Sequence, residues 1–183
     1  SASGDASLRL IFGGDLQPVN LDLIPNYADV FDNLKDRPWN TIDGVNYGVP
    51  HGRGANVLQY TLSKVKPAPD SWSVVWEANS PLKGKITAYD SAIYIADAAV
   101  YLMSTKPELG ITDPYALDSK QFEAAMALLK QQKPLVAEYW ADYTKYVAAV
   151  QAGSIVAGTS WQVIANVLNG EKATVGAVKP KEG

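Results

Sequence analysis

Three predicted junctions between secondary-structure elements carry side chains suited to binding a small ligand. Asp90 follows the predicted strand Gly84–Tyr89 and precedes the predicted helix Ser91–Met103. Its carboxylate is placed to hold a ligand ammonium through a charge-assisted hydrogen bond. The simpler alternative is that Asp90 only caps the helix, a position that aspartate favours.

The second junction carries Trp161, between the predicted strand Ser154–Thr159 and the predicted helix Gln162–Leu168. An indole ring there can flank an alkyl chain or lie over a cation, although it could instead pack between two lobes. Trp140 follows the predicted strand Leu135–Tyr139 and is a weaker candidate of the same kind. In open α/β sheets ligands bind at the carboxyl ends of the strands, which favours these positions.

The third candidate is Arg53, which stands between two glycines in the segment His51-Gly-Arg-Gly54. The glycines let the backbone approach a ligand closely, and the planar guanidinium suits a carboxylate. The alternative is a solvated arginine in a loop. Ser1 and Ser3 precede the predicted helix Ala6–Phe12, whose N-terminus would attract an anionic group.

The composition offers little to an enzyme, a metal or a nucleic acid. His51 is the only histidine and cysteine is absent, and no Walker A loop, Gly-x-Gly-x-x-Gly or Gly-x-Ser-x-Gly elbow occurs. We therefore expect no catalysis, no cofactor and no metal, with a hydrolase or transferase using His51 as the alternative from another class. The net charge is −3 and basic runs are missing, so we expect no nucleic-acid partner.

Predicted strands alternate with predicted helices along most of the chain, which indicates an α/β sheet with crossover connections. Besides those named above, the pattern predicts strands at Val45–Val49, Ala55–Leu62 and Ala173–Val178 and helices at Ser119–Lys130 and Asp142–Gln151. Asp118 and Gln121 have the spacing of a capping box. No apolar stretch approaches the ~20 residues of a membrane span.

Three segments in order resemble the spermidine/putrescine-binding proteins, the solute receptors of polyamine-type ABC importers. They are Asp43-Gly-x-x-Tyr-Gly-Val-Pro50, Lys66-Pro-Ala-Pro-Asp-Ser-Trp72, and Val150-Gln-Ala-Gly-x-Ile-Val-Ala-Gly158 up to Trp161. The resemblance implies an α/β, periplasmic-binding-protein-like (type II) fold with two lobes joined by hinge strands. This chain would be an incomplete, internal piece of such a receptor.

The same resemblance implies how the lobes divide. Residues 1–52 would be part of the first lobe, 53–161 the second lobe, and 162–183 a return to the first. It also implies a periplasmic full-length protein whose signal peptide is not in this piece, an ABC permease in the membrane as partner, and closure of the lobes on the ligand. We expect a monomer.

Carried over residue by residue, the resemblance implies that Asp90 binds a ligand ammonium and that Trp161 lines the aliphatic chain. Ser1 to Ser3 fall near a pocket loop. Two positions depart from the pattern: Ile93 stands where polyamine receptors have a second acidic residue, and Arg53 stands where they have an aromatic or neutral one.

Both departures favour a ligand with one ammonium and one carboxylate, such as the ω-amino acid γ-aminobutyrate. Arg53 would hold the carboxylate with help from Ser3, and Trp140 would help Trp161 enclose the methylenes. The alternative within the family is a putrescine or spermidine receptor whose second carboxylate comes from a segment outside this chain. A further alternative is that this piece alone binds nothing.

Overall fold

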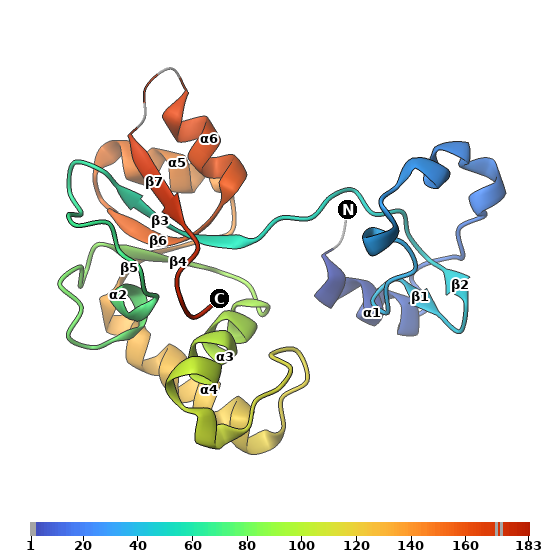
Figure 1. The fold of residues 1–183 in the computed structure, drawn as a ribbon, viewed down its shortest axis with the longest axis horizontal. Coiled ribbons are helices and arrows are strands. Elements are labelled where there is room, and N and C mark those ends of the chain that lie inside the picture. Colours follow the sequence, from blue (N-terminus) through green and yellow to red (C-terminus); the bar gives the residue numbers. More distant parts are fainter. Residues whose placement is uncertain (1–2, 171, 173) are drawn as a thin grey trace. The chain divides into compact units, whose positions relative to one another are not determined.

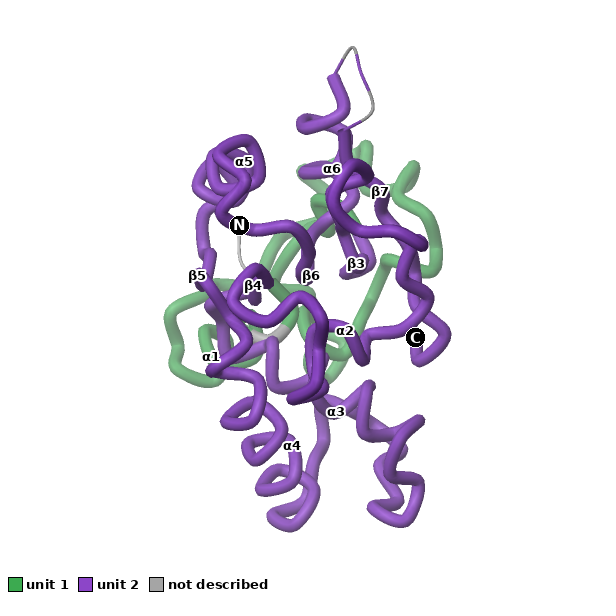
Figure 2. The backbone as a smooth tube through the Cα atoms, turned by 90° about the vertical axis from the view of Figure 1, so that its left-hand side faces the viewer, with its two compact units in different colours: residues 1–53 green, residues 54–183 purple. Residues whose placement is uncertain are grey.

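The computed structural model forms two compact units, residues 1–53 and 54–183 (Figure 2). It describes residues 3–170, 172 and 174–183. Each unit is considered by itself below.

The first unit consists of short elements joined by polar contacts. They are α1 (Gly4–Phe12), η1 (Leu21–Leu23), η2 (Pro25–Asp29), η3 (Asp32–Leu34), β1 (Thr41–Ile42) and β2 (Val45–Asn46). Asp43 and Gly44 both have positive φ and connect β1 to β2 as the predicted turn. The predicted strand Val45–Val49 is shorter in the structure, because pairing with β1 ends at Asn46.

Polar contacts take the place of an apolar core in this unit. Among its described side chains only that of Asn46 is buried. The Asn46 amide donates to the hydroxyl of Tyr27 at 3.2 Å and to the carboxylate of Asp36 at 3.4 Å. Phe12 and Phe31 remain more than 70% exposed, at 74% and 77%. The described residues of this unit therefore lack a buried apolar core, although several of their apolar side chains are half-buried.

One five-stranded sheet organises the described residues of the second unit, in the order β5-β4-β6-β3-β7. Its strands are β3 (Asn56–Thr61), β4 (Ile86–Tyr89), β5 (Val136–Trp140), β6 (Ala157–Trp161) and β7 (Val175–Val178). β4 runs parallel to both β5 and β6, whereas β3 runs antiparallel to β6 and β7. The parallel strands are connected through helices, as the alternating pattern predicts.

Helices cover both faces of this sheet: α3 and α4 lie on one side, and α5 and α6 on the other (Figure 1). The helical elements are α2 (Ser73–Trp76), α3 (Tyr94–Thr105), η4 (Pro107–Leu109), α4 (Ser119–Gln132), η5 (Lys133–Leu135), α5 (Tyr143–Ala152) and α6 (Gln162–Asn169). The capping box predicted for α4 is confirmed, since Asp118 accepts from the Gln121 amide at 2.8 Å and Gln121 accepts from Asp118 at 3.0 Å.

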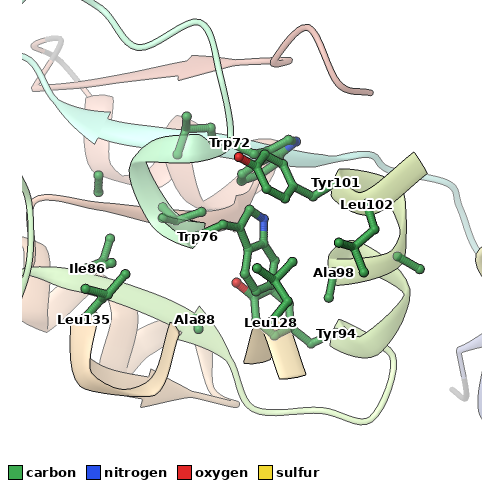
Figure 3. Packing of buried hydrophobic residues seen from close by; sticks show 14 of the residues in the cluster. Trp72, Trp76, Ile86, Ala88, Tyr94, Ala98, Tyr101, Leu102, Leu128 and Leu135 are labelled. Carbon is green, nitrogen blue, oxygen red and sulfur yellow. The ribbon is translucent and has the colours of Figure 1, made fainter. Parts of the chain in front are cut away.

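The larger apolar core lies between the sheet and α2, α3 and α4. At its centre the ring of Trp76 stacks on Tyr94, with ring centroids 5.2 Å apart, and lies 6.2 Å from Tyr101 (Figure 3). A smaller core on the opposite face is built from Trp140, Tyr146 and Ile164 together with neighbouring residues. The start of α3 and the ends of the strands are thus fixed by packing from both faces.

The segment after residue 161 stays with the second unit. β7 pairs with β3 in the register Leu58↔Val178 to Thr61↔Val175, and the return of residues 162–183 to the first lobe of a longer receptor stays a prediction. Residues 54–183 also form one compact unit. How the two units correspond to the lobes of a longer receptor stays a prediction.

Replacement of Gly158 tests the close contact between β4 and β6. A Cβ at residue 158 would lie 2.2 Å from the carbonyl oxygen of Thr87, so Gly158→Ala must push two central strands apart. We expect a loss of about 3 kcal/mol of unfolding free energy, measured by urea unfolding of the 183-residue chain. Gly54→Ala is the matched control, since a Cβ there meets nothing within 4 Å. Equal stability of the two variants would contradict this contact.

Candidate functional site

The carboxyl ends of three parallel strands meet at one edge of the second unit's sheet. Tyr89 of β4 pairs with Trp140 of β5, and the Asp90 amide donates to the Trp140 carbonyl at 2.7 Å. On the other side of β4, Ile86 and Thr87 pair with Ala157 and Gly158 of β6. That register, continued along both strands, brings Asp90 level with Trp161. This is the edge at which open α/β sheets bind ligands.

Asp90 does not cap α3. The helix begins at Tyr94 with Ile93 as its N-cap, and no side chain caps it by a hydrogen bond. Between Asp90 and the helix the chain forms a turn, in which the Tyr94 amide donates to the carbonyl of Ser91 at 3.0 Å. The capping alternative is therefore wrong, and the carboxylate is exposed rather than used by the backbone.

An open depression of about 460 Å³ surrounds this carboxylate. Its walls come from the end of β4, the start of α3, α4 and β5: Tyr89, Asp90, Ser91, Ala92, Tyr94, Ile95, Leu129 and Tyr139. The pKa of Tyr139 is raised, first by burial and second by the negative charge of Asp90. The Tyr139 ring is nevertheless 43% exposed. A negative charge thus lies beside an accessible aromatic ring, an arrangement that suits a cation.

Four aromatic rings continue from the depression to the neighbouring strand end. Tyr89 lies 4.7 Å from Trp140 and 5.3 Å from Trp161, measured between ring centroids. Trp161 is half-buried and meets Trp140 edge to face at 4.9 Å, and Trp140 meets Tyr146 at 5.3 Å. Trp161 does not line the depression itself. Tyr89 lines it, and the Tyr89 ring also contacts the Trp161 ring.

Trp140 belongs to the core of the unit. Its side chain is 1% exposed, and its indole N–H donates to the Thr159 carbonyl at 3.1 Å. The ring therefore has no open face for a ligand in this structure, because packing and a hydrogen bond use both its apolar surface and its polar atom. Trp140 packs edge to face against Trp161 and so supports the Trp161 ring.

The remaining predicted residues belong to the first unit. Arg53 is exposed and is the last residue of that unit. Ser3 is the N-cap residue of α1, and its carbonyl accepts from the amides of Ala6 and Ser7, both at 3.0 Å. Ser1 lies outside the described residues. Participation of these residues in one site with Asp90 stays a prediction.

One carboxylate at this edge was missed by the sequence reasoning. Asp97 lies in the first turn of α3 and accepts from the Asn56 amide at 2.9 and 3.0 Å, one distance to each carboxylate oxygen. Burial raises the pKa of Asp97 to about 6, and the bond from Asn56 lowers it only in part. The sequence does single out Asp97, because it is the only charged residue between Ser91 and Met103, the bounds of the predicted helix.

Within the described residues, no group of three or more His, Asp or Glu side chains is arranged to hold a metal ion. No described helix combines the length and apolar character that a membrane crossing requires.

A model of the family described as bacterial extracellular solute-binding protein matches residues 3–183. The chain belongs to this family. The prediction of a solute-binding protein rather than an enzyme is thereby confirmed.

Solved structures show the same fold. The spermidine/putrescine ABC transporter substrate-binding protein PotD from Streptococcus pneumoniae has a TM-score of 0.72 at 16% identity, covering 98% of this chain and 51% of that one. The TpPotD lipoprotein of Treponema pallidum has a TM-score of 0.77 at 17% identity, covering 99% and 54%. AgtB from A. tumefaciens R10, solved with agropinic acid, has a TM-score of 0.71 at 19% identity, covering 96% and 49%.

The α/β periplasmic-binding-protein fold predicted from the sequence is therefore confirmed, in partial form. This solute-binding chain spans about half the length of the solved structures that it matches.

The raised pKa of Asp97 predicts how stability depends on pH. Because the folded-state pKa lies above the ordinary value, the native state binds a proton more tightly than the unfolded chain. The stabilisation from this proton is complete below about pH 4 and is lost as the pH rises through about 6. We expect this loss to be on the order of 2 kcal/mol.

Asp97→Asn should remove this component of the pH dependence, as measured by urea unfolding at pH 4.5 and 7.5. The variant is expected to lose less stability than the wild type between these two values. An identical loss in both proteins would contradict the burial of a titrating carboxylate at this position.

Proposed function

We propose that the full-length protein is the substrate-binding component of an ABC importer and that its ligand is a small linear amine. The observation that carries this proposal is the exposed Asp90 carboxylate in an open depression that Tyr89 and Tyr139 also line. A ligand ammonium would gain a charge-assisted hydrogen bond from the carboxylate and favourable contact with the ring faces.

The aromatic rings beside Asp90 would hold the rest of the ligand. Tyr89 lines the depression with Asp90, and its ring contacts that of the half-buried Trp161, so the methylenes of an amine bound to Asp90 would lie against these two rings. Trp140 would act through Trp161, because its own ring is enclosed. Binding by contact and charge needs no cofactor and no reacting group, which agrees with the family.

Linear polyamines such as putrescine and spermidine are the ligands that we favour. The name of the S. pneumoniae protein connects this fold with spermidine and putrescine in that protein. The second unit presents a carboxylate and aromatic rings at its strand ends, and Arg53 belongs to the other unit. Asp90 and the aromatic rings near it therefore offer an ammonium group both a negative charge and ring faces.

A zwitterionic ω-amino acid such as γ-aminobutyrate is the second candidate, and it depends on Arg53. Arg53 is exposed, and its guanidinium together with Ser3 would hold a ligand carboxylate. Ile93 in place of a second acid favours the same candidate. AgtB, solved with agropinic acid, indicates that this fold also accommodates an acidic ligand in that protein.

The proposal extends to location and partners. The full-length protein would be periplasmic and would act as a monomer that delivers its ligand to an ABC permease in the membrane. The first unit would form part of one lobe and the second unit the other, so that closure brings the two together on the ligand.

Removal of the Asp90 charge should abolish most of the affinity for amines. In the full-length receptor we expect Asp90→Asn to weaken putrescine and spermidine binding at least about tenfold, measured by calorimetry, because the charge-assisted bond is lost. Asp70→Asn changes an exposed aspartate of the same unit that has no side-chain hydrogen bond among the described residues, and should leave affinity unchanged. Equal affinities of both variants would rule out Asp90 as the ammonium site.

Arg53→Met distinguishes the two ligand candidates. If γ-aminobutyrate is the ligand, the variant should lose at least about tenfold in affinity for it, since the partner of the carboxylate is removed. For polyamines the same change should leave affinity unchanged or raise it. Tight binding of putrescine with none of γ-aminobutyrate in the wild type would exclude the zwitterion.

A further inference from the structure

Four lysines lie at the edge of the second unit's sheet that is opposite Asp90. Lys64 follows the end of β3, Lys83 and Lys85 precede β4, and Lys133 precedes β5. β3 runs antiparallel to β6, whereas β4 runs parallel to β5 and β6, so the end of β3 meets the starts of β4 and β5 at this edge. All four side chains are exposed. We call these four residues the lysine row.

Backbone hydrogen bonds hold the segments of the lysine row side by side. The Gly84 amide donates to the Leu135 carbonyl at 2.8 Å, and the Val156 amide donates to the Lys85 carbonyl at 2.7 Å. The Thr61 amide donates in turn to the Val156 carbonyl at 2.8 Å. Because three strand spacings separate β5 from β3 in the sheet, the row extends about 14 Å along the edge. The row is therefore fixed by the sheet, although its members come from three separate segments of the sequence.

The positive charge of the row is not neutralised by neighbouring acids within the described residues. The only ion pair in that part of the chain lies in the first unit. The segments that carry the row, 62–66, 83–85 and 133–135, contain no acidic residue. Glu77, the acid that precedes Lys83 in sequence, accepts a hydrogen bond from the Tyr101 hydroxyl at 2.7 Å. Although the whole chain has a net charge of −3, this edge of the sheet presents a positive surface.

We propose that the lysine row is a docking surface for a membrane that contains anionic phospholipids. Lysine ammonium groups near such a membrane are attracted one by one to the lipid charges, and a fluid bilayer needs no matching shape. An acidic protein is the less suitable partner, because protein interfaces are enriched in arginine and depleted in lysine. Residues 54–183 contain no arginine, and the row consists of lysine alone. Its composition therefore favours lipid headgroups.

Leu62 adds an apolar group beside the row. Its side chain is 37% exposed, and its amide donates to the Thr174 carbonyl at 3.1 Å, which holds it two residues before Lys64. Peripheral membrane binding combines burial of apolar groups with attraction between charges. Because the row and Asp90 lie at opposite edges of the sheet, the ligand site stays open while the row contacts lipid. This docking function goes beyond the proposed ligand binding and does not depend on it.

Two triple variants of the full-length receptor, prepared without any attached lipid, test the proposal. Both remove three exposed lysine charges, so they have the same net charge. The row variant combines Lys83→Gln, Lys85→Gln and Lys133→Gln. The control variant changes lysines at the end of α3, at the start of α4 and on α5, and combines Lys106→Gln, Lys120→Gln and Lys145→Gln.

Co-sedimentation with phospholipid vesicles measures the binding. We expect the wild type to bind vesicles of phosphatidylcholine with about 30% phosphatidylglycerol and not vesicles of phosphatidylcholine alone. One lysine near an anionic surface contributes about fivefold in affinity, so the row variant should bind at least about tenfold more weakly. The control variant should change less than about twofold. Because screening shortens the reach of exposed charges, raising NaCl from about 0.05 M to about 0.5 M should abolish wild-type binding.

Three results overturn the inference: equal loss of vesicle binding in both variants, no loss in the row variant, or a wild type that does not bind the anionic vesicles. Retention on immobilised polyglutamate, lost in the row variant and without vesicle binding, would identify an acidic protein as the partner and also overturns it.

Calorimetry with putrescine on the same proteins separates this inference from the proposed function. We expect unchanged putrescine affinity in both triple variants, which also shows that they are folded. A wild type that binds anionic vesicles but neither amines nor γ-aminobutyrate overturns the proposed ligand class and leaves the lysine row in place. A wild type that binds putrescine but no vesicles does the reverse.

Discussion

Parallel pairing of β4 with β5 on one side and with β6 on the other determines where every candidate ligand group of the second unit lies. The pairing brings Asp90, Trp140 and Trp161 to one edge although they are far apart in sequence. It requires a glycine at 158, because the carbonyl of Thr87 occupies the space of a Cβ. The position of the ligand-binding candidates at the sheet edge thus depends on the close backbone contact between Thr87 and Gly158.

Buried polar contacts extend this constraint to the helices. Gln132 at the end of α4 donates to the Tyr94 hydroxyl at 2.8 Å and to the Val75 carbonyl at 2.9 Å. Tyr94 also contacts the Thr159 hydroxyl of β6 at 3.4 Å. These bonds connect α2, α3, α4 and the sheet, and a buried network of this kind favours one arrangement of its members. The start of α3, which forms a wall of the depression, is held by it.

Local signals were sufficient for much of the fold. The Asp118–Gln121 capping box and the Asp43-Gly44 turn depend on residues that are neighbours in the chain, so their geometry can be read from spacing alone. The alternation of strands and helices identified the α/β class for the same reason. The order of strands in the sheet, and with it the place of β7 beside β3, depends on contacts between distant segments.

The candidate site was predictable only in part. Asp90 and Trp161 stand out because they follow strands, and the structure brings their strand ends together. Whether a tryptophan at such an end is open or enclosed depends on packing from a second helix layer, and for Trp140 that packing encloses it. Asp97 could not be predicted from local sequence, because its place at this edge depends on the hydrogen bond from Asn56, 41 residues earlier in the chain.

The distribution of buried apolar side chains has a consequence for biosynthesis. Residues 54–183 contain both apolar clusters in one uninterrupted stretch, whereas the described residues 3–53 contain no buried apolar side chain. A newly made segment 54–183 can therefore bury its apolar side chains without any buried apolar side chain from residues 3–53. Phe12 and Phe31 stay exposed in the folded chain, so a chaperone that shields these two rings would act on residues 3–53 rather than on the part that contains the apolar clusters.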